Sequence, residues 1–102
     1  KQYEFFETGL RQHSAVQKVD RLYDRKFLAV RKRLPDLTIV LIDAYEMSAE
    51  DVRNARERYG AFDAALKMTS YGAITSAADQ AADSMGAGAF KWGELLARLN
   101  KP

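Results

Sequence analysis

The stretch "LTIVLIDAYEMSAEDVRNARERYGAFDAALKM" (residues 37–68) decides the fold, because a strand, a helix and a second strand follow one another in it. It opens with a continuous β-branched and aliphatic run, which is typical of a strand covered on both faces. Ser48 and Asp51 form a capping box that predicts a helix start, and Gly60 is the residue type expected just past the helix end. Residues 62–68 predict a shorter second strand. This succession favours a right-handed crossover between parallel strands.

The same alternation continues beyond this stretch. Thr75 or Ser76 caps a further helix that stops at Gly86. "GAFKW" (residues 88–92) is typical of a third, weaker strand, and "GELLARLN" (residues 93–100) of a closing helix.

Residues 14–34 carry the pattern of one long basic helix. Ser14 and Gln17 resemble a capping box, and Pro35 would end the helix. Apolar residues recur between them every three or four positions, at Val16, Val19, Tyr23, Phe27, Val30 and Leu34.

We therefore predict an α/β fold, as one small three-layer domain over residues 1–102 or as a fragment of a longer chain. Its sheet is mainly parallel with three strands, and the long N-terminal helix packs across it. "YEFFE" (residues 3–7) is either a short helix or a fourth strand. A sheet this small has open edges, which favours a homodimer or a larger assembly.

Composition narrows the classes of function. The chain has 102 residues and no cysteine, which excludes disulfides, thiolate nucleophiles and cysteine-based zinc sites. No apolar run reaches the length needed to cross a bilayer, so we expect no membrane partner. The absence of cysteine fits a cytoplasmic protein. Residues 1–35 hold nine Lys or Arg against four acidic residues. This bias favours a polyanionic partner, or else belongs to a solvated helix face.

The carboxyl ends of parallel strands meet at one rim of a sheet, where ligands bind. The candidates for phosphate or nucleic-acid binding there are Lys67, Ser70 and Lys91, joined by the basic helix end Arg31, Lys32 and Arg33. Asp43 lies at the same rim, where it either binds a ligand or only ends its strand. The alternative for the whole set is that these residues merely solvate the starts of loops.

Residues 62–100 resemble the C-terminal part of Mrr-type restriction endonucleases. The matching positions are a strand end, a helix with Ala at four-residue spacing and a leucine-rich last helix, at Thr69, Ser76, Ala77, Ala81, Leu95 and Leu99. The resemblance implies a nuclease-like fold and, in the family, a carboxylate followed by Glu or Gln, one residue and Lys, which hold Mg²⁺ and position water. Here the stretch reads Asp43-Ala44-Tyr45, so the lysine is replaced by tyrosine. We expect no upstream hairpin with a second carboxylate.

Three hypotheses about function follow. The first is a degenerate nuclease-like domain that binds nucleic acid without catalysis and without a cofactor. The second is a protein-interaction module whose open sheet edge and aromatic anchors Tyr3, Phe5 and Phe6 contact a partner, unless these rings fill the domain's own core. The third is a Mg²⁺-dependent nuclease in which Asp43 and Glu46 bind the metal and Lys67 replaces the missing lysine.

Overall fold

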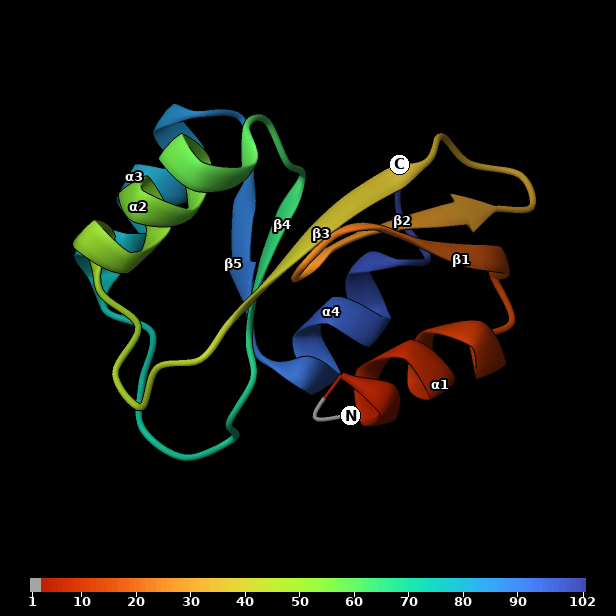
Figure 1. The fold of residues 1–102 in the computed structure, drawn as a ribbon, viewed down its shortest axis with the longest axis horizontal. Helices are drawn as coiled ribbons and strands as arrows, with labels where there is room; N and C mark the ends of the chain where they lie inside the picture. Colours follow the sequence, from red (N-terminus) through yellow and green to blue (C-terminus); the bar gives the residue numbers. More distant parts are fainter. Residues whose placement is uncertain (1–2) are drawn as a thin grey trace.

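The computed structural model describes residues 3–102 as three layers, with a five-stranded mixed sheet between two pairs of helices (Figure 1). The sheet order is β1-β2-β3-β4-β5; β1, β2 and β3 are antiparallel neighbours, whereas β3, β4 and β5 are parallel. Among residues 3–102, no helix is both long and apolar enough to span a bilayer. The elements are α1 (Glu4–Gln12), β1 (Val16–Tyr23), β2 (Lys26–Arg31), β3 (Leu37–Ile42), α2 (Ala49–Tyr59), β4 (Ala64–Lys67), α3 (Ser76–Ser84), β5 (Gly88–Phe90) and α4 (Trp92–Arg98).

The parallel half of the sheet confirms the sequence prediction. β3 pairs in parallel with β4 from Ile39↔Ala64 to Ile42↔Lys67, and β4 pairs in parallel with β5. Helix α2 starts with the predicted capping box, in which the Ser48 hydroxyl accepts from the Asp51 backbone N–H at 3.1 Å. These elements formed as predicted because their signals are local.

The antiparallel half corrects the sequence prediction. Residues 14–34 do not form a helix: they form the hairpin β1–β2, whose turn contains Asp24 at φ 48°. The sheet is therefore mixed with five strands and not mainly parallel with three. The segment "YEFFE" belongs to helix α1 and supplies no strand. The three-layer α/β class is confirmed, but the hairpin takes the place of the long basic helix.

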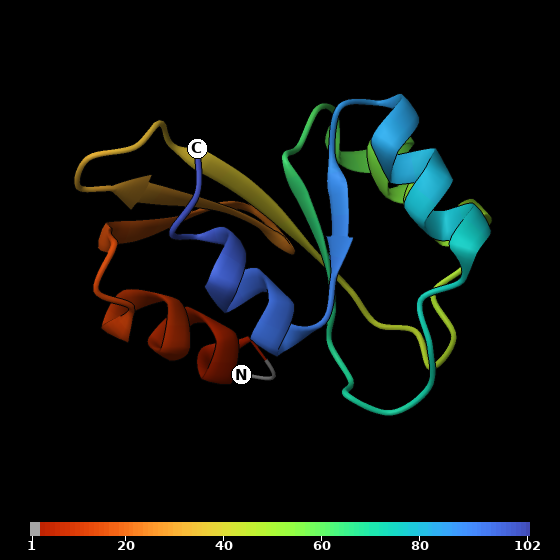
Figure 2. The ribbon, with the colours of Figure 1, turned by 180° about the vertical axis from the view of Figure 1, so that it is seen from behind.

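Two cores occupy the two faces of the sheet. One lies under α1 and α4, where Phe6 and Leu10 meet Leu95 and Leu99 over strand residues that include Phe27. The other lies under α2 and α3 and consists of Val40, Ile42, Met47, Val52, Ala55, Phe62, Ala65, Ala78, Ala81 and Ala82. Figure 2, seen from behind, shows α1 and α4 side by side on their face of the sheet.

The loops that follow β3 and β4 pair with each other. The Met47 N–H donates to the Ala73 carbonyl at 2.9 Å, and the Thr75 N–H donates to the Met47 carbonyl at 3.0 Å. Gly72 has a φ of +76° and lies so close to the Tyr45 carbonyl that a Cβ there would be 2.0 Å from the oxygen. Both the backbone angle and the close approach require glycine at this position.

Candidate nucleic-acid interface

The predicted basic cluster at residues 31–33 does not form one surface. Arg31 is 4% exposed, and it donates to the Pro35, Leu99 and Lys101 carbonyls at 2.7, 3.1 and 2.6 Å. It therefore fixes the end of α4 to the sheet, and burial lowers its pKa. Lys32 and Arg33 are exposed in the turn after β2.

The rim candidates are separated from this turn. Because β2 runs antiparallel to β3, the turn after β2 lies at the sheet end opposite the one where β3 and β4 finish. Lys67, Ser70 and Lys91 belong to that second end, so the sequence prediction joined groups that the hairpin keeps apart.

Lys67 is an internal group, with 1% of its surface exposed. Its Nζ donates to the Thr69 carbonyl at 2.9 Å and to the Tyr71 carbonyl, and it lies 5.7 Å from the centre of the Tyr45 ring. Burial, and then the nearby charge of Lys91, lower the pKa of Lys67. The lysine thus holds the rim loops in place. Ser70 is exposed in the loop above it.

The predicted aromatic anchors divide between the core and the surface. Phe6 is buried in the α1/α4 core, while Phe5 is 64% exposed and lies against Trp92 with a ring distance of 5.6 Å. Tyr3 is half-buried and belongs to the site described next.

Seven residues from three distant segments form what we call the Arg/Tyr cluster: Tyr3, Arg21, Tyr23, Asp24, Arg25, Arg58 and Tyr59. Tyr3 precedes α1, residues 21–25 form the end of β1 and the hairpin turn, and residues 58–59 end α2. The sequence pattern does not predict this arrangement, because it favours a helix that would carry Arg21 and Arg25. The only signal was the excess of basic residues in the first third of the chain.

Cations and rings alternate within the Arg/Tyr cluster. The Arg21 and Arg25 guanidinium carbons lie 5.0 and 5.7 Å from the centre of the Tyr3 ring, and the Arg25 Nε donates to the Tyr3 hydroxyl at 3.1 Å. Arg58 lies 5.7 Å from the Tyr23 ring and 5.3 Å from the Tyr59 ring. These contacts hold the three guanidinium groups in a common surface.

Asp24 occupies the centre of the cluster. Its Oδ2 accepts from the Tyr59 hydroxyl at 2.8 Å and from Arg58 Nη2 at 3.1 Å, and its carbonyl accepts from Arg21 Nε at 2.7 Å. The Tyr59 hydrogen bond, followed by that of Arg58, lowers the pKa of Asp24. Burial, followed by the bond to Asp24, raises the pKa of Tyr59.

A pocket of about 380 Å³ opens beside the cluster. The exposed Asp43 lines it, together with Asp51 and Asn54 of α2. The Tyr3 hydrogen bond, and to a smaller extent the charge of Asp43, raise the pKa of Arg25. Asp43 thus places a carboxylate in a pocket bordered by the guanidinium groups of Arg25 and Arg58.

The carboxylates present do not fit the magnesium ion that the family resemblance implies. Within residues 3–102, no three His, Asp or Glu side chains lie close enough to hold a metal ion. Asp24 binds Arg58 and Tyr59, Asp51 caps α2, and Glu46 accepts from the Ala73 N–H at 3.2 Å. Lys67 and Asp43 share no hydrogen bond in the described part of the chain, so no hydrolytic step follows from this geometry.

Comparison with known proteins adds no identity. No family model, no curated protein and no solved structure matches this chain. The site must therefore be interpreted from its own geometry.

Proposed function

We propose that this chain is a degenerate, nuclease-like domain that binds nucleic acid without cleaving it, and that the Arg/Tyr cluster is its contact surface. The observation that carries the proposal is an open pocket lined by two guanidinium groups and two tyrosine rings, those of Arg25, Arg58, Tyr3 and Tyr59. Arg21 stacks on the Tyr3 ring and Tyr23 lies against Arg58, so a third guanidinium group and a third ring flank the pocket. Arginine forks match the oxygens of a phosphate, and aromatic rings offer faces to bases.

The proposal gives a different part to each group. Arg21 and Arg58 are exposed, and their guanidinium groups are the proposed phosphate contacts. Tyr23 is 55% exposed and offers part of its ring to a base. Asp43 accepts hydrogen bonds from a base amino group within the pocket, because a carboxylate in this position repels phosphate but suits an N–H donor.

The family resemblance supports the nuclease-like part of the proposal. Such nucleases hold one of their acidic residues on a hairpin upstream of the catalytic strand. Here the hairpin β1–β2 precedes β3 and carries Asp24 in its turn. The arginine and tyrosine partners of Asp24, and Tyr45 in place of the lysine, accord with binding in the absence of catalysis.

Fluorescence anisotropy of labelled oligonucleotides tests the proposal, with single-stranded DNA, RNA and duplex DNA titrated at several salt concentrations. Binding must weaken steeply with salt, because phosphate contacts release counterions. The double variant Arg21→Gln/Arg58→Gln should lose two phosphate contacts. This lowers the slope of log affinity against log salt by about 1.4 for single strands and about 1.8 for a duplex.

The matched control is Lys32→Gln/Arg33→Gln, which removes the same charge from exposed positions at the opposite end of the sheet. It should leave the salt slope within error of the unmodified protein. Equal losses in both double variants would assign the binding to net charge, and no binding at low salt would end the proposal. Circular dichroism checks that each variant is folded.

A further inference from the structure

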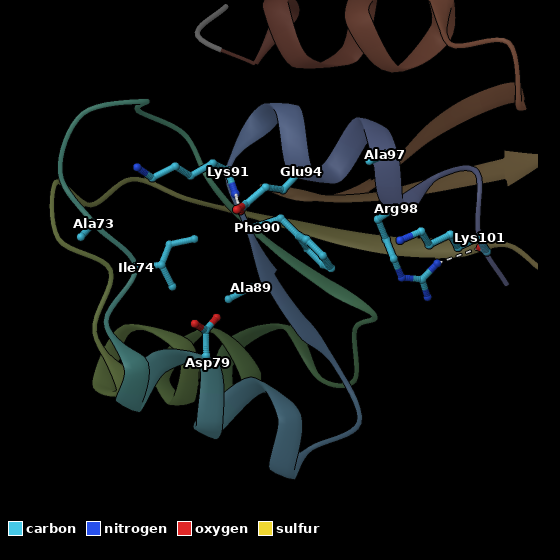
Figure 3. A pocket seen from close by; sticks show the side chains of 10 residues that line it. All are labelled: Ala73, Ile74, Asp79, Ala89, Phe90, Lys91, Glu94, Ala97, Arg98 and Lys101. Atoms are coloured by element: carbon cyan, nitrogen blue, oxygen red, sulfur yellow. Dashed lines mark hydrogen bonds between the residues drawn. The ribbon is translucent and has the colours of Figure 1, made fainter.

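The outer edge of β5 borders a groove between α3 and α4 that the nucleic-acid proposal does not use. A pocket of about 610 Å³ and a second of about 400 Å³ share Asp79, Ala89 and Phe90 in their walls, so they form one continuous depression, here called the β5 groove. Figure 3 shows the first pocket, with Asp79 on the α3 side and Arg98 and Lys101 on the opposite side.

The strand at the floor of the groove has a free backbone edge. β5 is the last strand of the sheet, and the Gly88 N–H donates inward to the Asp63 carbonyl at 3.0 Å. Backbone groups alternate in direction along a parallel strand, so the N–H and C=O of Ala89 point away from β4. An extended peptide can pair with such an unpaired donor and acceptor and so add a strand to the edge of the sheet.

The two walls of the groove carry opposite charges. Asp79 and Asp83 are exposed on α3, and neither forms an ion pair within residues 3–102. Lys91, Arg98 and Lys101 lie on the α4 side. The acid on that side, Glu94, is engaged locally, because its Oε1 accepts from the Lys91 N–H at 2.9 Å.

We propose that the β5 groove binds an extended peptide segment in which basic and acidic side chains alternate. Successive side chains of a strand point to opposite faces of the sheet. In a peptide paired with Ala89, every second side chain therefore meets the acidic α3 wall, and those between meet the basic α4 wall. Basic residues suit the first set and acidic residues the second.

A second copy of the chain suits the groove poorly. Antiparallel pairing of two β5 edges about a two-fold axis keeps each face of the sheet on its own side. The α3 wall of one copy would then meet the α3 wall of the other, bringing Asp79 and Asp83 against the same carboxylates. Like charges placed opposite each other are destabilising.

Two labelled hexapeptides of identical composition and zero net charge, with sequences RERERE and RRREEE, test the proposal by NMR titration of the isotope-labelled protein. The alternating peptide should shift the amide signal of Ala89 and bind about fivefold more tightly than the block peptide, since several cross-strand charge pairs each contribute. Equal affinities would overturn the proposal. Shifts centred on the hairpin turn would also overturn it.

Variants locate the site. Asp79→Asn/Asp83→Asn should reduce the affinity for RERERE about fivefold, whereas the control Glu50→Gln/Glu57→Gln, on exposed positions of α2, should leave it unchanged. Ala89→Pro removes the outward N–H and is a substitution that edge strands accommodate, so the peptide should no longer shift the amide signals of the neighbouring Gly88 and Phe90. Retained binding in the aspartate double variant would contradict the charge assignment. Dimerisation through β5, seen by light scattering and lost in Ala89→Pro, would replace the peptide by a second copy.

Discussion

Replacing Gly72 by alanine should destabilise the fold far more than the same change at Gly86, although both residues have a φ of +76°. A positive φ alone costs alanine about 1 kcal/mol relative to glycine. At Gly86 no neighbouring atom lies within 4 Å of the added Cβ, so the backbone angle is the only source of destabilisation in Gly86→Ala. At Gly72 the Cβ would lie 2.0 Å from the Tyr45 carbonyl oxygen, against 3.4 Å for an ordinary contact.

The two rim loops would have to separate to remove this clash. Separation breaks the hydrogen bonds that Met47 makes with Ala73 and Thr75, at 2.9 and 3.0 Å. At about 1 kcal/mol each, these bonds bring the total for Gly72→Ala to about 3 kcal/mol. Urea unfolding measures both variants, and in a domain of this size each kcal/mol lowers Tm by about 4–8 °C. Equal losses for the two variants would refute the close approach of Gly72 to the Tyr45 backbone.

Three further predictions concern buried or coupled groups. Because burial lowers the folded-state pKa of Lys67 below its unfolded value of 10.5, the unfolded chain binds more protons between the two values. The free energy of unfolding should therefore rise with pH through that window. Urea unfolding of Lys67→Met at the same pH values should show no such rise. Arg31→Met should lose about 2 kcal/mol of stability, because three carbonyls lose their donor, with oligonucleotide affinity of the folded variant unchanged in anisotropy. Tyr59→Phe should raise the pKa of Asp24, which NMR titration measures. In the unmodified protein, Asp24 contributes to the free energy of unfolding at pH values above its unfolded pKa. This contribution disappears as the pH falls through the lower folded pKa. Tyr59→Phe should therefore reduce the loss of stability at acid pH.

The elements with local sequence signals were predicted correctly. Residues 14–34 were predicted wrongly as a helix, because a β-bulge in β1 gives the apolar residues a helical spacing. The capping boxes and the apolar runs identified α2, α3 and the three parallel strands. In β1 a register shift between Val16 and Lys18 turns both Val16 and Val19 inward, three positions apart, as in a helix. The strict alternation in β2, with Phe27, Ala29 and Arg31 buried, is the signal of a strand. The alternation is not visible in the sequence, because one of the buried positions carries an arginine.

The candidate site was less predictable than the fold. The Arg/Tyr cluster brings Tyr3, a hairpin turn and the end of α2 together, and no spacing in the sequence reports that proximity. Two of the proposed phosphate ligands, Arg31 and Lys67, have the right chemistry but are buried. Burial of a cation depends on which carbonyls surround it, and here those belong to loops and to the end of α4.

The packing of α1 against α4 sets the order in which the chain can fold during synthesis. Leu10 and Leu95 belong to one core but lie 85 positions apart in the sequence. At a synthesis rate of about 5–20 residues per second, Leu95 is added roughly 4–17 s after Leu10. During that interval the meander β1–β2–β3 already has all its strands, but the side of α1 where the Phe6 ring meets Trp92 remains uncovered. The last helix is thus the step that protects the first one from aggregation.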